Sequence, residues 1–510
     1  MMNNLYLGIE LGSTRIKAVA IDDMHRPVST GDYTWASSYE NGIWTYGLDE
    51  VWTGLKTALA GVKDRGDIRA MGISAMMHGY LAFDENWNLL VPFRTWQNTI
   101  TGQAAAELTA LLNFNIPQRW SIAHLYQAIL NGEAHVGKIA HITTLAGYVH
   151  YMLTGVNAIG IGEASGMFPI DSEVCDYDAQ MMAKANNLLA SHGFTVKLEE
   201  LLPRVLVAGQ EAGRLTQQGA DLLEGLLEPG IPFAPAEGDA ETGMTATNAI
   251  APRTGNVSAG TSIFSMVVLE HPLKAVHEEL DIVATPTGKS VAMVHCNNGT
   301  NDSNAWVNVL REAAALFGAQ PSAGELYTKL YQHSLQGDAD CGGILVCNYM
   351  AGESIAHLDA GRPMVVRRPD SNFTLANFFR AQLYSALATL KIGMDILAEE
   401  DVAIDSLTGH GGLFKTPGVG QRYLAAACNA AVTCMETAGE GGPYGMALLA
   451  AYLVKKEDAE SLEAYLDNRV FAKADSSTQQ PDPADVEGFT AYIRDYKAML
   501  QVEKTAVEML

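Results

Sequence analysis

The sequence predicts an α/β protein made of two domains with a similar plan. A turn with one glycine and two hydroxyl residues occurs twice, about half the chain apart, as Gly12-Ser13-Thr14 and Gly260-Thr261-Ser262. Each copy lies between apolar runs that are typical of strands, and each half continues with helical patterns. The length of 510 residues also exceeds what one hydrophobic core usually supports.

The repeated turn is suited to holding phosphate. Glycine allows a sharp turn and a close approach of the backbone to a ligand, and successive N–H groups with small hydroxyls bind phosphate oxygens. A single copy is typical of an ordinary hairpin. The duplication, with the carboxylate of Glu10 two residues before the first copy, favours two domains that hold one polyphosphate between them.

The composition restricts the classes of partner. A net charge of -25 argues against nucleic acid or an anionic membrane surface as a general partner. The six cysteines show no paired metal-ligand spacing. The start of the chain lacks the pattern of a signal peptide, and the longest apolar runs are too short to span a bilayer. We therefore expect a cytoplasmic protein with reduced thiols and no membrane partner.

Strand and helix patterns alternate along both halves. In the first half we expect strands at 5–9, 16–21, 26–29, 68–73 and 81–83, and helices at 48–60, 101–112 and 139–153. In the second half we expect a hairpin at 255–269, a strand at 290–295, and helices at 304–316, 379–397, 419–431 and 444–454. We place the first domain at 1–248, the second at 249–473, and a surface linker with a terminal helix at 474–510.

Three carboxylates lie in the glycine-bounded loop 236–243, before a helix that we expect at 244–249. A helix cap with acidic neighbours is one interpretation, because a carboxylate is favoured near a helix N-terminus. The other is a general base with neighbours that orient a metal, since phosphoryl transfer to an alcohol needs a carboxylate to accept the hydroxyl proton. Glu10 is suited to holding Mg2+ through water, or it is a solvated residue of an exposed hairpin.

Three further motifs are weak on their own. A glycine cluster at 409–412 lets a flat group such as adenosine approach the backbone. His78, in Met76-Met77-His78-Gly79, stands beside methionines, where packing is a commoner role than ligand binding. Trp96 and its neighbouring amides can stack on a sugar and bind its hydroxyls, although a surface loop has the same composition.

Taken in order, these motifs resemble the FGGY family of carbohydrate kinases, over nearly the whole chain to about residue 460. The order is the specific part: the opening turn, Met-His-Gly, the tryptophan loop, Ala164-Ser165-Gly166, the Gly-Asp loop, the second turn, Gly352-Glu353, Arg380-Ala381 and the adenosine glycines. The Met-His-Gly motif looks most like the xylulokinase branch. The resemblance implies two actin-like (ribonuclease H-like) ATPase domains with a cleft between them, and ATP and Mg2+ as cofactors.

The resemblance also implies roles for particular residues. Asp239 matches the catalytic base, which would also contact the sugar and, with Glu10, the metal. Met77, His78, Trp96 and Asn98 match positions that bind the sugar. The nucleotide-binding positions are matched by Gly12, Ser13, Thr14 and Lys17 in the first domain, and by Gly260, Thr261, Ser262, Gly411, Gly412 and Lys415 in the second.

Two departures from the family pattern concern the metal and the sugar. The family usually has Asp where this chain has Glu10, and the extra methylene would displace a metal-bound water. The usual Trp-Asn-Asp-x-Arg pattern is Trp96-Gln97-Asn98-Thr99-Ile100 here, so an amide replaces a charged acceptor and an aliphatic residue replaces a charged donor. Such changes alter which sugar is accepted.

We therefore expect an ATP-dependent kinase that phosphorylates a ketopentose such as D-xylulose, with glycerol and other sugars or polyols as alternatives. The rival is a sensor that binds sugar or nucleotide without turnover, an idea motivated by Glu10 and the altered tryptophan loop. A chaperone-type ATPase is disfavoured because no peptide-binding domain follows. The expected partners are the sugar and ATP, without nucleic acid, and a homodimer is implied by the family alone.

Overall fold

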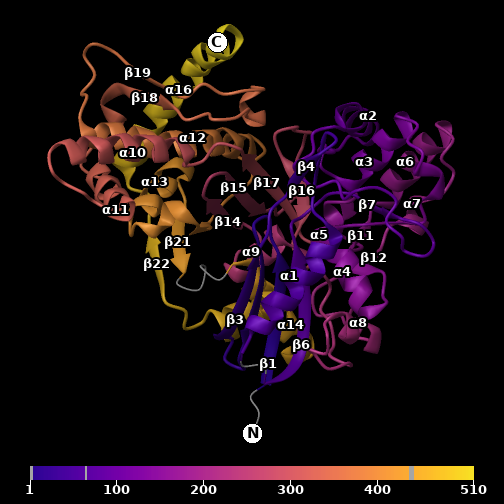
Figure 1. The fold of residues 1–510 in the computed structure, drawn as a ribbon. Coiled ribbons are helices and arrows are strands. Elements are labelled where there is room, and N and C mark those ends of the chain that lie inside the picture. The colour runs from indigo at the N-terminus through magenta and orange to yellow at the C-terminus, as the bar shows by residue number, and fades with distance from the viewer. Residues whose placement is uncertain (1–3, 64–65, 436–440) are drawn as a thin grey trace. The chain divides into compact units, whose positions relative to one another are not determined.

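The computed structural model describes residues 4–63, 66–435 and 441–510, which form two compact units (Figure 1). The first unit comprises 1–251, 281–291 and 440–474, and the second comprises 252–280, 292–439 and 475–510. The expected break near residue 248 lies close to one of these divisions. Residues 441–473, which we expected in the second domain, pack with the first unit, and 475–510 is part of the second unit rather than a separate segment.

A five-stranded sheet with the order β13-β6-β1-β2-β3 organises the first unit. Its strands are β1 (Asn4–Leu11), β2 (Arg15–Ile21), β3 (Pro27–Thr34), β6 (Asp67–Ala75) and β13 (Glu237–Gly238). The strands β1, β2 and β3 form the predicted antiparallel meander, whereas β6 is parallel to both β1 and β13. The carboxyl ends of β1, β6 and β13 therefore lie at the same edge of the sheet.

Helices cover both faces of this sheet (Figure 1). The register places Gly8 and Gly31 on opposite faces. A Cβ atom added to Gly8 would overlap the carbonyl oxygen of Pro443 in α14 (Gly442–Lys455). One added to Gly31 would overlap the carbonyl oxygen of Ala58 in α1 (Leu48–Gly61). Because α14 packs in backbone contact with β1, the segment that carries it belongs to the first unit.

The other elements of the first unit surround this core, and α2, α3 and α6 group together (Figure 1). The helices are α2 (Gly102–Leu112), α3 (Ser121–Leu130), α4 (Leu145–Thr154), α5 (Ile161–Ser165), α6 (Ala179–Ser191), α7 (Leu198–Leu201), α8 (Gln217–Leu222), α9 (Asp239–Ala246) and α15 (Leu462–Tyr465). The short strands are β4 (Ser38–Glu40), β5 (Ile43–Thr45), β7 (Leu81–Phe83), β8 (His141–Thr143), β9 (Ala158–Gly160), β10 (Ile170–Asp171), β11 (Asp176–Tyr177), β12 (Arg204–Leu206) and β16 (Asp281–Ala284).

The second unit repeats the plan of the first. The strands that this unit contributes to its sheet have the order β17-β15-β14-β20-β21-β22. They are β14 (Thr254–Ala259), β15 (Ile263–Val268), β17 (Ser290–Cys296), β20 (Ser406–His410), β21 (Ala431–Met435) and β22 (Ser476–Gln479). The hairpin β14-β15 corresponds to β1-β2, and β20 and β21 run parallel to β14 as β6 and β13 do to β1. The duplication predicted from the two turns is confirmed.

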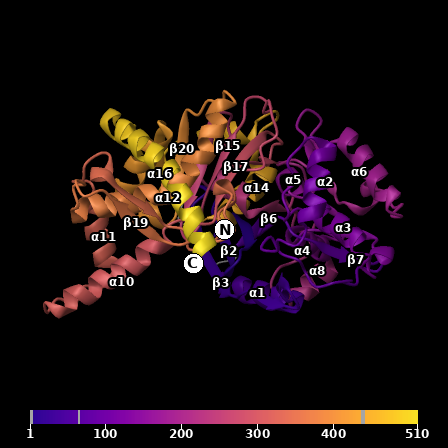
Figure 2. The same ribbon diagram turned by 90° about the horizontal axis from the view of Figure 1, so that it is seen from above.

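Helices and a small sheet complete the second unit. These elements are α10 (Asn301–Leu316), α11 (Ala323–Ser334), α12 (Leu375–Glu399), α13 (Val419–Cys428), α16 (Pro483–Met509), β18 (Ile344–Cys347) and β19 (Met364–Arg367). Helix α10 extends away from the other helices of its unit, and Leu316 and Phe317 at its C-terminal end are exposed (Figure 2).

Three expected elements are corrected. Helix α9 begins at Asp239 instead of residue 244, so Asp239 and Glu241 lie in its first turn, and Glu237 lies in β13. The expected helix at 139–153 is divided into β8 and α4, because the segment at 141–143 pairs with β7. The expected linker contains β22, which is exposed but pairs with β21.

The cysteines and the long helices agree with the sequence-based expectations. All six cysteines are free thiols. Across the residues that the structure describes, no helix combines the length and the apolar composition needed to cross a membrane.

The contact between α14 and β1 gives a stability prediction. Gly8→Ala is expected to lower the free energy of unfolding by about 2 kcal/mol or more, because backbone atoms of α14 block the new methyl group. Gly137→Ala is the control, since its added Cβ has no atom within 4 Å, and its effect should stay below about 1 kcal/mol. Urea unfolding checks both variants, and equal midpoints would contradict the packing argument.

Candidate active site

Three parallel strands of the first unit deliver the predicted chemical groups to one edge of the sheet. Glu10 lies near the end of β1, Met77 and His78 follow β6, and Asp239 follows β13. The backbone N–H of Met77 donates to Asp239 Oδ1 at 3.1 Å. The structure thus brings the predicted base into direct contact with the predicted sugar-binding segment.

Asp239 is the first residue of α9, and its carboxylate accepts backbone N–H groups. Burial raises the pKa of Asp239 to about 6, while the N–H groups of Met77 and Ala240 oppose that rise. A carboxylate with this pKa is mainly ionised at neutral pH and is a stronger base than a free aspartate.

The carboxylate of Glu10 lies between the first turn and the start of α14. Its Oε1 lies 3.2 Å from the position of a Cβ added to Gly12, and a Cβ added to Gly442 would overlap its Oε2. Burial, followed by the charge of Asp239, raises the pKa of Glu10 to about 8, and Lys17 opposes the shift. The sequence analysis did not predict this role of Gly442. Its one signal in the sequence is the pair Gly441-Gly442 before a helix.

The donor set fits Mg2+ held together with phosphate. Glu10 and Asp239 supply carboxylate oxygens, and their charges interact strongly enough to raise the pKa of Glu10. Magnesium is usually bound by one or two carboxylates, several waters and substrate phosphates. Within the described ranges, no group of three or more His, Cys, Asp or Glu residues is arranged to bind a metal. The residues therefore suit a metal that arrives with a nucleotide rather than a permanent metal cage.

The first turn is tied to the protein through its carbonyl groups. The indole N–H of Trp35 donates to Gly12 O at 2.7 Å, and the Tyr46 hydroxyl donates to Ser13 O at 2.7 Å. The backbone N–H of Trp35 donates to Thr14 O at 3.2 Å. In the described part of the chain, the N–H groups and hydroxyls of Ser13 and Thr14 have no partner. The turn therefore presents donors, which is what an anion requires.

His78 has an unusual backbone conformation for its residue type. Its φ is 70°, a left-handed value that a non-glycine residue seldom adopts without a local reason. Its ring stacks on Trp120 with the centroids 6.4 Å apart. A Cβ added to Gly166 would lie 2.5 Å from His78 Nδ1, so the Ala-Ser-Gly motif leaves room for this ring.

In the tryptophan loop, the surroundings of Asn98 differ from those expected of a sugar-binding residue. Trp96 is half-buried and packs against the core of the first unit. Asn98 is buried, its Oδ1 accepts from Trp44 N, and its Nδ2 donates to the carbonyls of Trp44 and Thr95. Both ends of this amide are engaged by backbone, so Asn98 holds the loop instead of offering a free group to a sugar.

Three buried glutamates lie around Asp239; the sequence analysis gave Glu237 and Glu241 as neighbours that orient a metal and gave Glu163 no role. Glu163, Glu237 and Glu241 are at most 1% exposed, and Glu163 N donates to Glu237 Oε2 at 3.0 Å. Burial raises the pKa of Glu163 and of Glu237 well above the usual range. Burial, with the charge of Asp239, also raises the pKa of Glu241 to about 8. Burial thus favours the protonated form of all three side chains.

In the second unit, a neighbouring loop supports the second turn. Gly260 O accepts from Thr300 N and Oγ1, both at 2.9 Å, and Thr261 O accepts from Gly299 N at 2.7 Å. As in the first unit, the carbonyls of the turn are bound by protein, and the side chain of Thr261 is exposed.

The predicted adenosine glycines lie beside this turn. Gly411 has a φ of 99°, and a Cβ added there would lie 2.5 Å from Ala259 O at the end of β14. Gly412 is exposed, with its added Cβ 3.8 Å from the same oxygen. Lys415 is exposed in the next helical turn. The second unit thus brings the second turn and the glycine cluster together.

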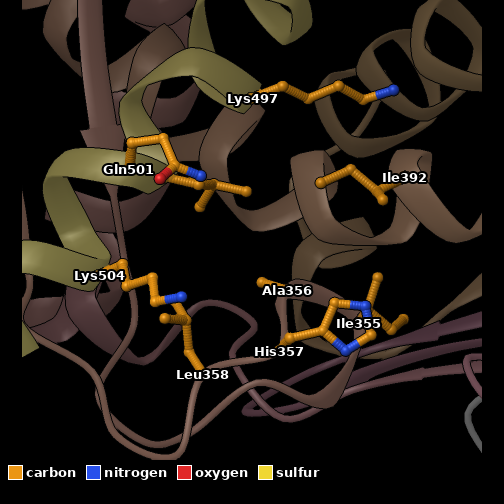
Figure 3. A pocket seen from close by; sticks show the side chains of 9 residues that line it. Ile355, Ala356, His357, Leu358, Ile392, Lys497, Gln501 and Lys504 are labelled. Atoms are coloured by element: carbon orange, nitrogen blue, oxygen red, sulfur yellow. The ribbon is translucent and has the colours of Figure 1, made fainter.

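A separate cavity of about 320 Å³ lies in the second unit between α12, α16 and the turn at 354–356 (Figure 3). Its lining includes Lys497, Gln501 and Lys504 from α16, with Ile355 and Leu358 opposite. None of its residues belongs to the predicted site.

Models of known protein families match both halves of the chain. The FGGY family of carbohydrate kinases, N-terminal domain, matches residues 5–245, and the C-terminal domain of that family matches residues 255–454. The chain belongs to the FGGY family of carbohydrate kinases, and the sequence-based assignment is confirmed.

The sequence relatives include xylulose kinases. The chain is 22% identical to the xylulose kinase of Haemophilus influenzae over 462 residues, which cover 86% of this chain and 89% of that one. It is 20% identical to the xylulose kinase of Staphylococcus xylosus over 467 residues, which cover 87% and 90%.

Solved structures confirm the fold class. A xyloylose kinase from Brucella ovis has a TM-score of 0.79 at 19% identity, covering 98% of this chain and 99% of that one. A gluconate kinase from Lactobacillus acidophilus gives 0.80 at 15%, covering 99% and 100%. Plasmodium falciparum glycerol kinase with ADP gives 0.76 at 14%, covering 97% of each. The two-domain α/β fold, of the actin-like class, is the fold of these kinases.

The buried glutamates give a prediction on stability and pH. Because the pKa of Glu241 is raised from 4.5 to about 8 on folding, its contribution to stability is complete below pH 4.5 and is lost as the pH rises through 8. Glu241→Gln has no ionisable carboxyl group at this position and so loses this pH dependence. The free energy of unfolding of the variant, relative to that of wild type, should therefore rise between pH 5 and pH 9. Urea unfolding at several pH values measures it. Exposed Glu173→Gln is the control, and parallel pH curves for wild type and Glu241→Gln would contradict the prediction.

Proposed function

We propose that this carbohydrate kinase transfers the γ-phosphoryl group of ATP to a hydroxyl of a ketopentose such as D-xylulose. The observation that carries the proposal is the 3.1 Å hydrogen bond from Met77 N to Asp239 Oδ1. It joins the only acidic residue that matches the family's base to the segment that matches its sugar site. A base must lie within hydrogen-bond reach of the proton that it accepts.

Each group has a defined part in this reaction. Asp239 accepts the proton of the sugar hydroxyl, and its burial makes it a stronger base. The donors of Ser13 and Thr14, and the turn at 260–262, hold phosphate oxygens. Mg2+, when bound with ATP near Glu10 and Asp239, supplies charge that stabilises the phosphates. Glu10 orients the waters of that ion.

The substrate is inferred from the sugar-binding segment and the relatives. Met77 and His78 match the xylulokinase branch, and the two sequence relatives described above are xylulose kinases. The structural neighbours also include gluconate and glycerol kinases, so an acid sugar and a polyol belong in any substrate panel. Loss of the charged pair in the tryptophan loop favours a neutral sugar.

The substrate test is an ADP-release assay with ATP and Mg2+ over ketopentoses, glycerol, gluconate, aldoses and deoxy sugars. Strong stimulation by D-xylulose supports the proposal, and stimulation by another member of the panel replaces the substrate but keeps the kinase. ATP binding without stimulation by any member of the panel would favour the rival sensor.

The role of Asp239 is tested by Asp239→Asn. The amide keeps the shape and cannot accept the proton, so kcat should fall by about a thousandfold or more, while ATP binding measured by calorimetry changes little. Exposed Asp359→Asn is the matched control and should retain wild-type turnover. Turnover near that of wild type in Asp239→Asn would remove Asp239 from the role of base.

The same base sets the acid limb of the pH profile. Because burial raises the pKa of Asp239 to about 6, kcat/KM should fall by about tenfold per pH unit below that value, as the base becomes protonated. The measurement is kcat/KM for the sugar between pH 5 and pH 8, with circular dichroism to confirm folding. A flat profile down to pH 5 in folded protein would exclude this assignment.

A further inference from the structure

The loop between β17 and α10 supports the second turn, and the loop is itself held by the buried side chains of Asn348 and Glu353. Thr300 and Gly299 donate three hydrogen bonds to the carbonyls of Gly260 and Thr261. A Cβ added to Gly299 would overlap Gly260 O, so the two backbones are in direct contact. The position of the second turn therefore depends on the position of the loop at 298–300.

Asn298 begins this loop and has no freedom to move independently. It is 2% exposed, and its Oδ1 accepts from Met350 N at 2.8 Å and from Ala351 N at 3.0 Å. Its Nδ2 donates to the carbonyl of Ala351 at 3.2 Å. The segment at 350–352 thus holds one side of the Asn298 side chain.

Glu353 holds the other side of Asn298. It is fully buried, and its Oε2 accepts from Asn298 N at 3.2 Å and from Asn298 Nδ2 at 3.0 Å. Its own backbone is fixed by bonds in both directions with Leu358, which close the turn at 354–356. A buried carboxylate is costly, and these N–H donors are what offset the cost.

We infer that Glu353 is a positioning residue for the nucleotide: it fixes Asn298, and through Gly299 and Thr300 it fixes the second phosphate turn. The inference rests on the proposed binding of ATP phosphate at 260–262. It assigns a physical role to the Gly-Glu motif, which is separated from the turn by about ninety residues in sequence. Glu353 does not touch the nucleotide in this scheme and acts through two hydrogen-bonded steps, which are joined by the backbone of residues 298–300.

The test compares nucleotide binding in Glu353→Ala and Glu353→Gln. Loss of a buried hydrogen bond to a charged group weakens an interaction by about tenfold, so Glu353→Ala should raise the Kd and KM for ATP by about that factor. The KM for the sugar should change by less than about twofold, because no sugar contact is lost. Glu353→Gln retains an acceptor oxygen and should restore most of the ATP affinity.

A second buried glutamate separates positioning from general stability. Glu503 is also fully buried in the same unit, and it accepts the backbone N–H of Arg362 at 2.5 Å, far along the chain from the second turn. Glu503→Ala should lower the thermal midpoint without raising the Kd for ATP. If Glu503→Ala raises that Kd as much as Glu353→Ala does, the effect is one of stability and the inference is overturned.

Three further variants keep the inference testable if Glu353→Ala does not fold. Thr300→Val removes one donor to Gly260 O and preserves the shape of the side chain, so it should raise the ATP Kd while leaving the sugar KM unchanged. Asn298→Ala and the double variant Asn298→Ala/Glu353→Gln should have equal effects, since both act on one chain of contacts. Wild-type ATP affinity in Thr300→Val and Asn298→Ala would overturn the inference.

Calorimetry with ATP requires no sugar, which separates this inference from the proposed function. Tight ATP binding by wild type and unchanged binding by Glu353→Ala would reject the positioning role and leave the kinase intact. Failure of the wild type to bind ATP would instead contradict the proposed function itself.

Discussion

The parallel pairing of β1, β6 and β13 is the constraint on which the candidate site depends. Parallel strands have their carboxyl ends at one edge, so the residues that follow them meet although they are distant in sequence. This pairing brings Glu10, Met77 and Asp239 together. It also concentrates negative charge, and burial then raises the pKa of both acids. Two buried acids whose pKa values are raised are suited to bind a cation and to accept a proton.

The two turns at 12–14 and 260–262 use the same physical arrangement with different supporting residues. In the first unit, Trp35 and Tyr46 donate to the carbonyls of the turn. In the second unit, Gly299 and Thr300 do so. Because the carbonyl oxygens of each turn accept hydrogen bonds from protein donors, they do not face a ligand. The N–H groups and hydroxyls of the turn are then available to an anion. The turn sequence alone does not specify these partners.

Glycines decide where helices and loops can approach the site. Gly8 allows α14 to contact β1, Gly442 leaves room for the carboxylate of Glu10, and Gly166 leaves room for His78. At each of these positions an added Cβ would meet protein atoms closer than real Cβ contacts allow. The close approach of backbone in the first unit therefore shapes the surroundings of Glu10 and His78 as much as the polar residues do.

The sequence by itself determined the family, the duplicated plan and the two turns, and it singled out Asp239 as the candidate base, because short-range patterns and motif order encode them. Only the tertiary structure showed that α14 belongs to the first unit, that both ends of the Asn98 amide bind backbone groups, and that Trp35 and Thr300 donate to the carbonyls of the turns. The physical reason is that these features are long-range contacts. A buried side chain finds its hydrogen-bond partner across the fold, and neither spacing nor composition specifies that partner in a single chain.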